Sequence, residues 1–195
     1  MSDRIIGSGF QTLMVRGSFT LAILPLKEGR ARVTAKPSIL EKLSIHPDRV
    51  KARLEVVELE ELSPDDQVFV YLPTMQRLEV LGNVRAVLKG WVFDTLHLDH
   101  RSQAPLVADG FCDRLYLDYE SDSPADLSRF QVRNGTVAVH GAGTVTARVD
   151  HRLMADINGQ GNLRLLHRPE EGVTHRRNRK GGDLVFLRST ETKDD

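Results

Sequence analysis

Histidine and aspartate stand close together in the segment 97–100, which reads HLDH. In an extended strand, neighbouring side chains point to opposite faces, so His97 and Asp99 share one face and His100 points the other way. Imidazole and carboxylate groups are metal ligands, but a site needs at least a third ligand from another part of the chain. We therefore expect the solvated outer face of a strand here, and we predict no metal site and no cofactor.

Carboxylates are numerous enough between residues 113 and 126 to suggest acid–base chemistry on a polysaccharide. Their separations of 5, 4 and 4 residues place them on no single strand face: Asp113, Asp118, Asp122 and Asp126. No Gly-x-Ser-x-Gly nucleophile motif is present. The single cysteine, Cys112, has no evident partner, which is typical of a packed thiol. The sequence therefore predicts a non-enzymatic protein.

A basic run occupies residues 175–180 (HRRNRK) and is followed by two glycines. Such a run attracts anionic partners such as lipopolysaccharide, nucleic acid or acidic lipid. It has no interleaved aromatic residue on which a base could stack, so nucleic acid is not expected. We expect a solvated loop, whose binding candidates are Arg176, Arg177, Arg179 and Lys180.

Glycine-rich turns occur at 141–143 (GAG) and 158–162 (NGQGN). A phosphate-binding loop lies between a strand and a helix, and its P-loop form ends in Gly-Lys-Ser/Thr. Strand-like residues follow both turns, and that ending is absent. We interpret both as corner turns in which glycine and asparagine allow a left-handed backbone.

Short runs with every second residue apolar dominate the chain, as in half-buried strands. One helix is predicted over about 39–45, between Pro37 and Pro47. Ser38 and Glu41 have the spacing of a capping box at its start.

Apolar-x-apolar cores recur at intervals near 20 residues in the second half, with a second series between them. The cores are 78–80, 96–98, 115–117, 137–139 and 163–165. Each unit is too short for a strand–helix–strand crossover, which takes about 30 residues. Short strands at a fixed spacing fit a β-solenoid, while an antiparallel sandwich remains the alternative on texture alone.

The order of these elements resembles a bacterial family, the auto-transporter adhesin head domains or GIN domains. The segments 137–147 (VAVHGAGTVTA) and 153–163 (LMADINGQGNL), followed by Pro169 and Gly172, are similar to its glycine turns between short strands. The segment 10–21 (FQTLMVRGSFTL) is similar to its opening strand pair, and 50–56 and 68–72 to its next elements. The resemblance covers roughly residues 8–187.

The resemblance implies an all-β, right-handed, single-stranded parallel β-helix with no catalytic residues, to which the sequence adds a short N-terminal helix. We expect an N-terminal tail over 1–9, one solenoid domain over 10–187 and a disordered tail over 188–195. The outer faces are expected to bind protein or a cell-envelope glycan, with Arg114, Tyr116 and Tyr119 as further binding candidates. A self-assembling scaffold of the bactofilin type, a homo-oligomer, is the alternative.

Composition narrows the partners and the location. The chain of 195 residues has 27 Lys and Arg and 27 Asp and Glu, so its formal net charge is zero. A dedicated nucleic-acid binder normally has a basic excess. No apolar run is long enough to span a membrane or to form a signal peptide. A cytoplasmic location is therefore expected if the sequence is complete, whereas the resemblance implies the cell envelope or periplasm.

Overall fold

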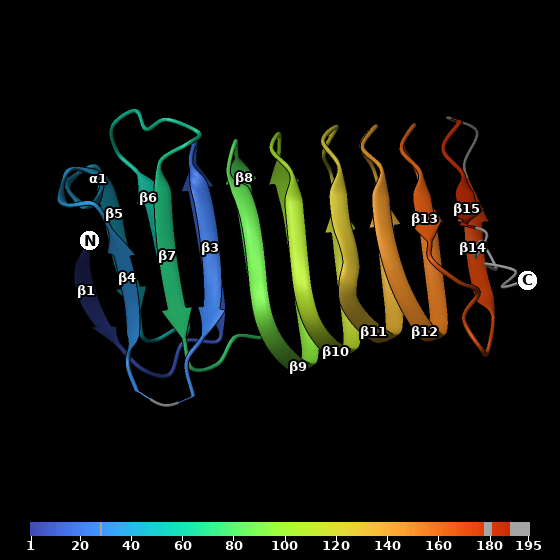
Figure 1. Cartoon of the computed structure of the whole chain (residues 1–195), viewed down its shortest axis with the longest axis horizontal. Coiled ribbons are helices and arrows are strands. Elements are labelled where there is room, and N and C mark those ends of the chain that lie inside the picture. Colours follow the sequence, from blue (N-terminus) through green and yellow to red (C-terminus); the bar gives the residue numbers. More distant parts are fainter. Residues whose placement is uncertain (28, 178–180, 188–195) are drawn as a thin grey trace, which may run out of the picture.

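The computed structural model describes residues 1–27, 29–177 and 181–187. This part of the chain is mostly β, with one short helix, as the sequence predicts. The strands run across the long axis of the molecule and wind into a β-solenoid of about 5 turns (Figure 1). Two sheets face each other across a core of apolar side chains, and successive turns pair in parallel, so the solenoid and not the antiparallel sandwich is the correct alternative.

The front sheet faces the viewer in Figure 1. Its order is β1 (Ser2–Gly7), β4 (Ala31–Ala35), β7 (Gln67–Leu72), β3 (Thr20–Pro25), the first parts of β9 (Arg85–Ser102), β10 (Leu106–Tyr119), β11 (Ala125–Val139) and β12 (Val145–Ile157), then β13 (Leu163–Leu165) and β15 (Leu184–Phe186). The back sheet has the order β5 (Leu43–Asp48), β6 (Arg53–Glu58), β2 (Thr12–Gly17), β8 (Arg77–Gly82), the second parts of β9 to β12, and β14 (Val173–Arg177). Strands β9 to β12 thus pass from one sheet to the other.

Parallel register places equivalent apolar residues of successive turns above one another. In the back sheet one inward column contains Leu78, Leu98, Leu117, Val137 and Ala155. These residues lie roughly 20 positions apart, which explains the repeat in the sequence. The repeat core at 163–165 does not continue this column, because β13 belongs to the front sheet.

The order of the first turns in space differs from their order in the sequence. Strand β2 lies between β6 and β8, and β3 lies between β7 and β9. The first solenoid turn of the chain is therefore inserted between two later ones. No spacing in the sequence signals this insertion, because the inserted strands have the same alternating pattern as their neighbours.

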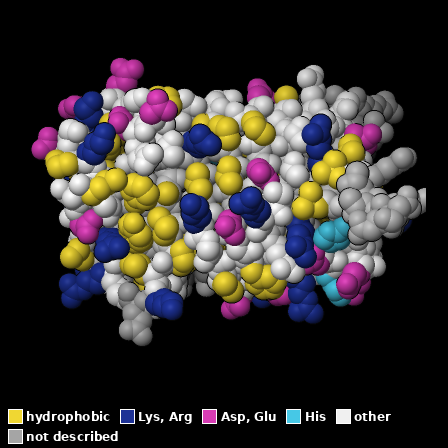
Figure 2. All heavy atoms as spheres, in the orientation of Figure 1, with side chains coloured by type: hydrophobic (Ala, Val, Ile, Leu, Met, Phe, Trp, Pro, Cys, Tyr) yellow, Lys and Arg dark blue, Asp and Glu magenta, His cyan; other side chains and the backbone are white. Residues whose placement is uncertain are grey.

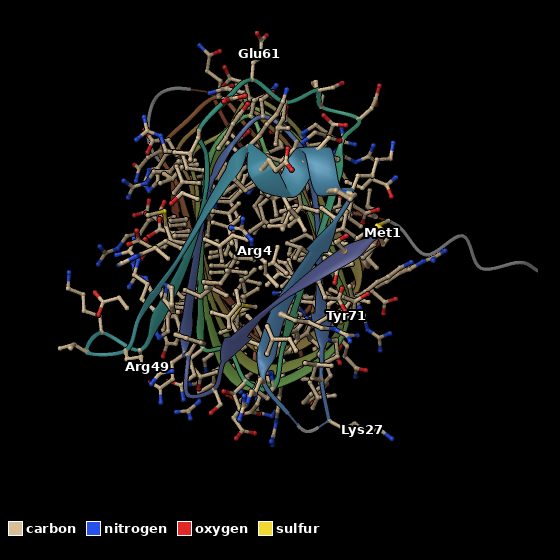
Figure 3. The ribbon with its side chains drawn as sticks, turned by 90° about the vertical axis from the view of Figure 1, so that its left-hand side faces the viewer. Met1, Arg4, Lys27, Arg49, Glu61 and Tyr71 are labelled. Atoms are coloured by element: carbon tan, nitrogen blue, oxygen red, sulfur yellow. The ribbon has the colours of Figure 1, made fainter. Side chains whose placement is uncertain are left out.

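The N-terminal end of the solenoid is covered by antiparallel strands and the helix. Strand β4 pairs antiparallel with β7, β5 with β6, and β1 with β4. The helix α1 (Pro37–Glu41) joins β4 to β5 at this end of the molecule (Figure 3). Its residues Ile39 and Leu40 are buried. The segment 1–9, expected to precede the solenoid, contains β1, whereas the segment 188–195 lies outside the described residues.

The predicted helix boundaries and capping box are wrong. The helix begins at Pro37 and ends at Glu41, and its N-cap residue is Lys36, which makes no side-chain capping bond. Proline at the first helical position needs no N–H partner, so Pro37 starts the helix and does not precede it. The residues after Glu41 join β5, whose pairing with β6 outweighs the helical pattern.

The glycine turns are corner turns, as predicted, but the reason given for their glycines is wrong. Gly141, Gly143, Gly159 and Gly161 are absent from the positive-φ residues. They stack so closely that a Cβ on Gly159 would lie 2.1 Å from the carbonyl oxygen of Gly141. These turns require glycine for close approach between rungs, not for a left-handed backbone.

Candidate binding groove on the back sheet

A stacked pair of aromatic rings lies on the outer face of the back sheet. Parallel register places His97 on β9 beside Tyr116 on β10. Their ring centroids are 4.6 Å apart and their planes differ by 7°, and Tyr116 is 41% exposed. The two rings therefore stack face to face across two rungs, each covering one face of the other, and this pair is called the platform below. His97 and Asp99 are both on the outer face and His100 is buried, as the alternation in the sequence predicts.

Small side chains create a hollow next to this platform. Thr136 and Ala138 on β11 lie in register with Tyr116 and Asp118 on the rung before them. A cavity of about 270 Å³ is lined by Arg77, His97, Asp99, Tyr116, Asp118, Thr136 and Ala138. A second one of about 280 Å³ is lined by Thr136, Ala138, Met154, Asp156, Thr174 and Arg176. The two share β11, and together they form one groove, called the back-sheet groove below.

A column of carboxylates runs along one side of the back-sheet groove. Asp99, Asp118 and Asp156 occupy equivalent positions on β9, β10 and β12, and Ala138 takes this position on β11. Arg176 on β14 continues the column, so a positive charge closes it at that end.

The ionic environment of this column changes along the solenoid. Toward the N-terminal end the acids are held by arginines, as where Arg77 lies 2.8 Å from Glu79 and 2.9 Å from Asp99. On the next rung, Asp118 is 45% exposed, and His140 Nε2 lies 3.4 Å from its Oδ1. A partly exposed carboxylate such as Asp118 beside an aromatic platform is suited to accept hydrogen bonds from hydroxyl groups of a ligand stacked on the ring.

The front sheet presents a different outer surface, which is the face visible in Figure 2. Half-buried apolar side chains follow one another in register across β7, β3, β9 and β10: Phe69, Ala22, Val87 and Val107. Hydrophobic side chains gather over β4, β7 and β3 in the figure. The cavity described along this stripe, beside Val87 and Val107, measures about 100 Å³, so the back sheet offers the larger hollow.

A family model described as "Putative auto-transporter adhesin, head GIN domain" matches residues 9–169, which is most of the chain. The chain belongs to this family. The GIN-domain description indicates no catalytic function. A search of curated proteins finds no match.

Solved structures share the GIN-domain fold at low sequence identity. A putative adhesin from Bacteroides fragilis NCTC 9343 is 10% identical, covers 95% of both chains and has a TM-score of 0.68. A putative adhesin from Parabacteroides distasonis ATCC 8503 is 12% identical over 95% of both chains, with a TM-score of 0.60. A putative lipid binding protein from the same strain is 12% identical over 96% of both chains, with a TM-score of 0.51. At these identities the likeness concerns the fold.

The binding candidates of this GIN domain fall into different places. Arg114 and Tyr116 are exposed on the outer face of β10, and Arg176 is exposed on β14. Arg177 is the last residue of β14 and lies in register with Ile157 on β12. Arg179 and Lys180 lie outside the described residues. The structure thus brings Tyr116 and Arg176 to the same groove, at opposite ends.

The prediction that Tyr119 is a binding residue on the outer face is wrong. Its side chain is fully buried and stacks on His100 with ring centroids 5.1 Å apart. Its hydroxyl donates to the carbonyl oxygen of Ser123, which fixes the corner between β10 and β11. Burial raises the pKa of Tyr119. Counted by alternation from Tyr116, position 119 falls on the inward face, so the sequence pattern held the signal that excludes it.

The remaining chemistry candidates are spread over the surface. Asp118 is on the back sheet, Asp122 accepts a bond from the Ala142 backbone at a corner, and Asp126 is on the front sheet. No group of three or more metal-binding side chains occurs among the described residues. No helix in the described part of the chain is long and apolar enough to cross a membrane.

Proposed function

We propose that this GIN domain is a non-catalytic binding module whose back-sheet groove holds an extended glycan. The observation that carries the proposal is the stacked His97–Tyr116 platform beside the partly exposed carboxylate of Asp118 in one groove. Sugar rings present apolar faces that stack on aromatic rings and hydroxyl groups that donate to carboxylates. The description of the family as an adhesin domain supports a binding role.

The repeat of the solenoid supports an extended ligand. Neighbouring strands lie about 4.8 Å apart, so the groove offers similar side chains at a regular interval along its length. Apolar Met154 is 53% exposed one rung beyond Thr136, and a second sugar ring would contact it there. A chain of several sugar units would therefore contact successive rungs of one groove.

A glycan array followed by titration calorimetry on the best ligand tests the proposal. Replacing Tyr116 with alanine removes the platform, and we expect affinity to fall about tenfold, since one aromatic contact contributes about 0.5–1.5 kcal/mol beyond area burial. The matched control is Tyr71→Ala on the front sheet, where Tyr71 packs under the guanidinium of Arg32. The variant Asp118→Asn keeps the shape of the groove and removes the negative charge of this one carboxylate.

Two results would contradict this function. One is an array on which the folded wild-type protein binds no glycan. The other is a ligand bound equally well by the wild type, Tyr116→Ala and Asp118→Asn. A loss of affinity in Tyr71→Ala, with none in Tyr116→Ala, would place the ligand on the front sheet instead.

A further inference from the structure

A cavity of about 450 Å³ lies at the N-terminal end of the solenoid, far from the back-sheet groove. It is lined by the end of β1, the link from β1 to β2, and two arginines that come from other segments: Arg30, just before β4, and Arg49, just after β5. Figure 3 looks onto this end of the molecule, where Arg49 lies at the lower left edge and Arg4 near the centre of the view. Three segments distant in sequence thus meet around one cavity.

The two arginines are charged and lack an acidic partner in the described part of the chain. No ion pair within that part involves Arg30 or Arg49. The acids nearest on β1 and β5 are already engaged: Asp3 pairs with Arg32, and Asp48 with Lys51. The guanidinium of Arg49 lies against the backbone of Gly7, because a Cβ built on that glycine would be 3.6 Å from Nη2.

The backbone of the same wall adds donors. Ser8, Gly9 and Phe10 follow β1 outside any strand, and none of their N–H groups donates to another described residue. Gly9 has a φ of +88°, in the left-handed region, so the chain turns at this residue. Successive N–H groups in such a turn form a concavity that binds anions. Arginine adds a planar fork that binds the oxygens of a phosphate in pairs.

We infer that this cavity, called the N-terminal cavity below, is a binding site for a phosphate group. Arg30 and Arg49 contact the phosphate oxygens from two sides, and the N–H groups of residues 8–10 donate from the third. A phosphate group supplies enough acceptor oxygens for both guanidinium groups and the backbone, which a carboxylate does not. The site is independent of the glycan groove on the back sheet.

Titration with inorganic phosphate, followed by amide NMR, tests the site directly. We expect the amide signals of Ser8, Gly9 and Phe10 to shift as phosphate is added and to stop shifting when the site is saturated. Arg49→Ala is expected to weaken phosphate binding about tenfold or more, because a hydrogen bond to a charged group contributes about 1.5–3 kcal/mol. The matched control, Arg168→Ala, removes an exposed arginine at the other end of the chain and is expected to bind phosphate as the wild type does.

Vesicles distinguish the source of the phosphate. Cosedimentation with vesicles of phosphatidylcholine containing phosphatidic acid, but not with phosphatidylcholine alone, identifies a lipid headgroup as the ligand. Binding of inorganic phosphate without cosedimentation identifies a soluble phosphate group, and not a lipid headgroup, as the ligand. In both cases the Arg30→Ala/Arg49→Ala variant is expected to lose binding, and Arg49→Lys, which keeps the charge without the fork, to bind with intermediate affinity.

The inference is overturned if the amide signals of residues 8–10 stay in place as phosphate is added. It is equally overturned if Arg30→Ala/Arg49→Ala binds both probes as the wild type does. The amide shifts are measured on the wild type, so this reading does not depend on how well the double variant folds.

Discussion

The corner glycines offer a sharp test of how the rungs are packed, and Gly143→Ala is the most informative change. A Cβ at position 143 would lie 2.0 Å from the carbonyl oxygen of Ser123 and 2.7 Å from that of Ser121. Neither oxygen is free to retreat. Ser121 O accepts the N–H of Gly143 at 2.9 Å, and Ser123 O accepts the hydroxyl of Tyr119. The new methyl group therefore forces neighbouring turns apart.

The cost follows from three contributions. Overpacking costs about 1–3 kcal/mol, and the weakened bond between rungs costs about 1 kcal/mol. Alanine also restricts the unfolded chain, which offsets about 0.4–1 kcal/mol. The net destabilisation is about 2 kcal/mol, which corresponds to a fall in Tm of about 4–8 °C for a chain of this size. Thermal and urea unfolding followed by circular dichroism measure it.

Gly90→Ala is the control, because a Cβ at position 90 meets open space, whereas a Cβ at position 143 meets two carbonyl oxygens. The two glycines also differ in conformation, since Gly90 has a left-handed backbone and Gly143 does not. Nothing lies within 4 Å of a Cβ built on Gly90, but its φ is +69°. The left-handed conformation costs an alanine about 1–2 kcal/mol. Because alanine also restricts the unfolded chain, about 0.4–1 kcal/mol of this cost is offset, as at position 143. We expect Gly143→Ala to be the more destabilising change. A smaller loss at Gly143 than at Gly90 would refute close stacking as the reason for glycine at the corners.

Further predictions concern buried groups. Burial raises the pKa of the Cys112 thiol to about 12, so we expect it to react with a thiol reagent only after denaturation; rapid labelling of the native protein would contradict its burial. Tyr119→Phe removes the hydroxyl that donates to Ser123 and is expected to cost about 1 kcal/mol in urea unfolding; an unchanged midpoint would show that this bond contributes nothing. Burial lowers the pKa of His100, so the unfolded chain takes up a proton near pH 6.5 before the folded protein does, and stability falls as the pH drops below that value. His100→Gln is expected to flatten this pH dependence.

The sequence predicts the solenoid well because each turn takes a similar number of residues. The inward residues of successive turns therefore recur at that interval along the chain. Leu98, Leu117 and Val137 are in register for this reason, and the alternation also places His97 outward and His100 inward. The helix boundaries could not be predicted in the same way. The pairing of β5 with β6 is a long-range contact that competes with local helix signals.

The back-sheet groove was only partly visible in the sequence. Tyr116 was identified, but the groove also depends on the small residues Thr136 and Ala138 on the next rung. Their role follows from register, which cannot be fixed until the corner lengths between strands are known. A small residue in line with aromatic or long side chains on neighbouring rungs is the signal that would find such a hollow once the register is set.

The covered N-terminal end bears on the alternative of an end-to-end scaffold. An edge strand is protected against pairing by proline, charged residues and bulges. Strand β5 contains Pro47 and ends at Asp48, while β1 has Asp3 and an irregular register between Ile5 and Gly7.

A filament needs both ends of each molecule, since head-to-tail contacts alone continue without limit. If the N-terminal end does not pair, self-association through the opposite end closes at a dimer. Light scattering over a concentration series is expected to show no species larger than a dimer. Growth beyond the dimer would show that the strands at the N-terminal end open to admit a second molecule, and it would favour the scaffold over the binding module.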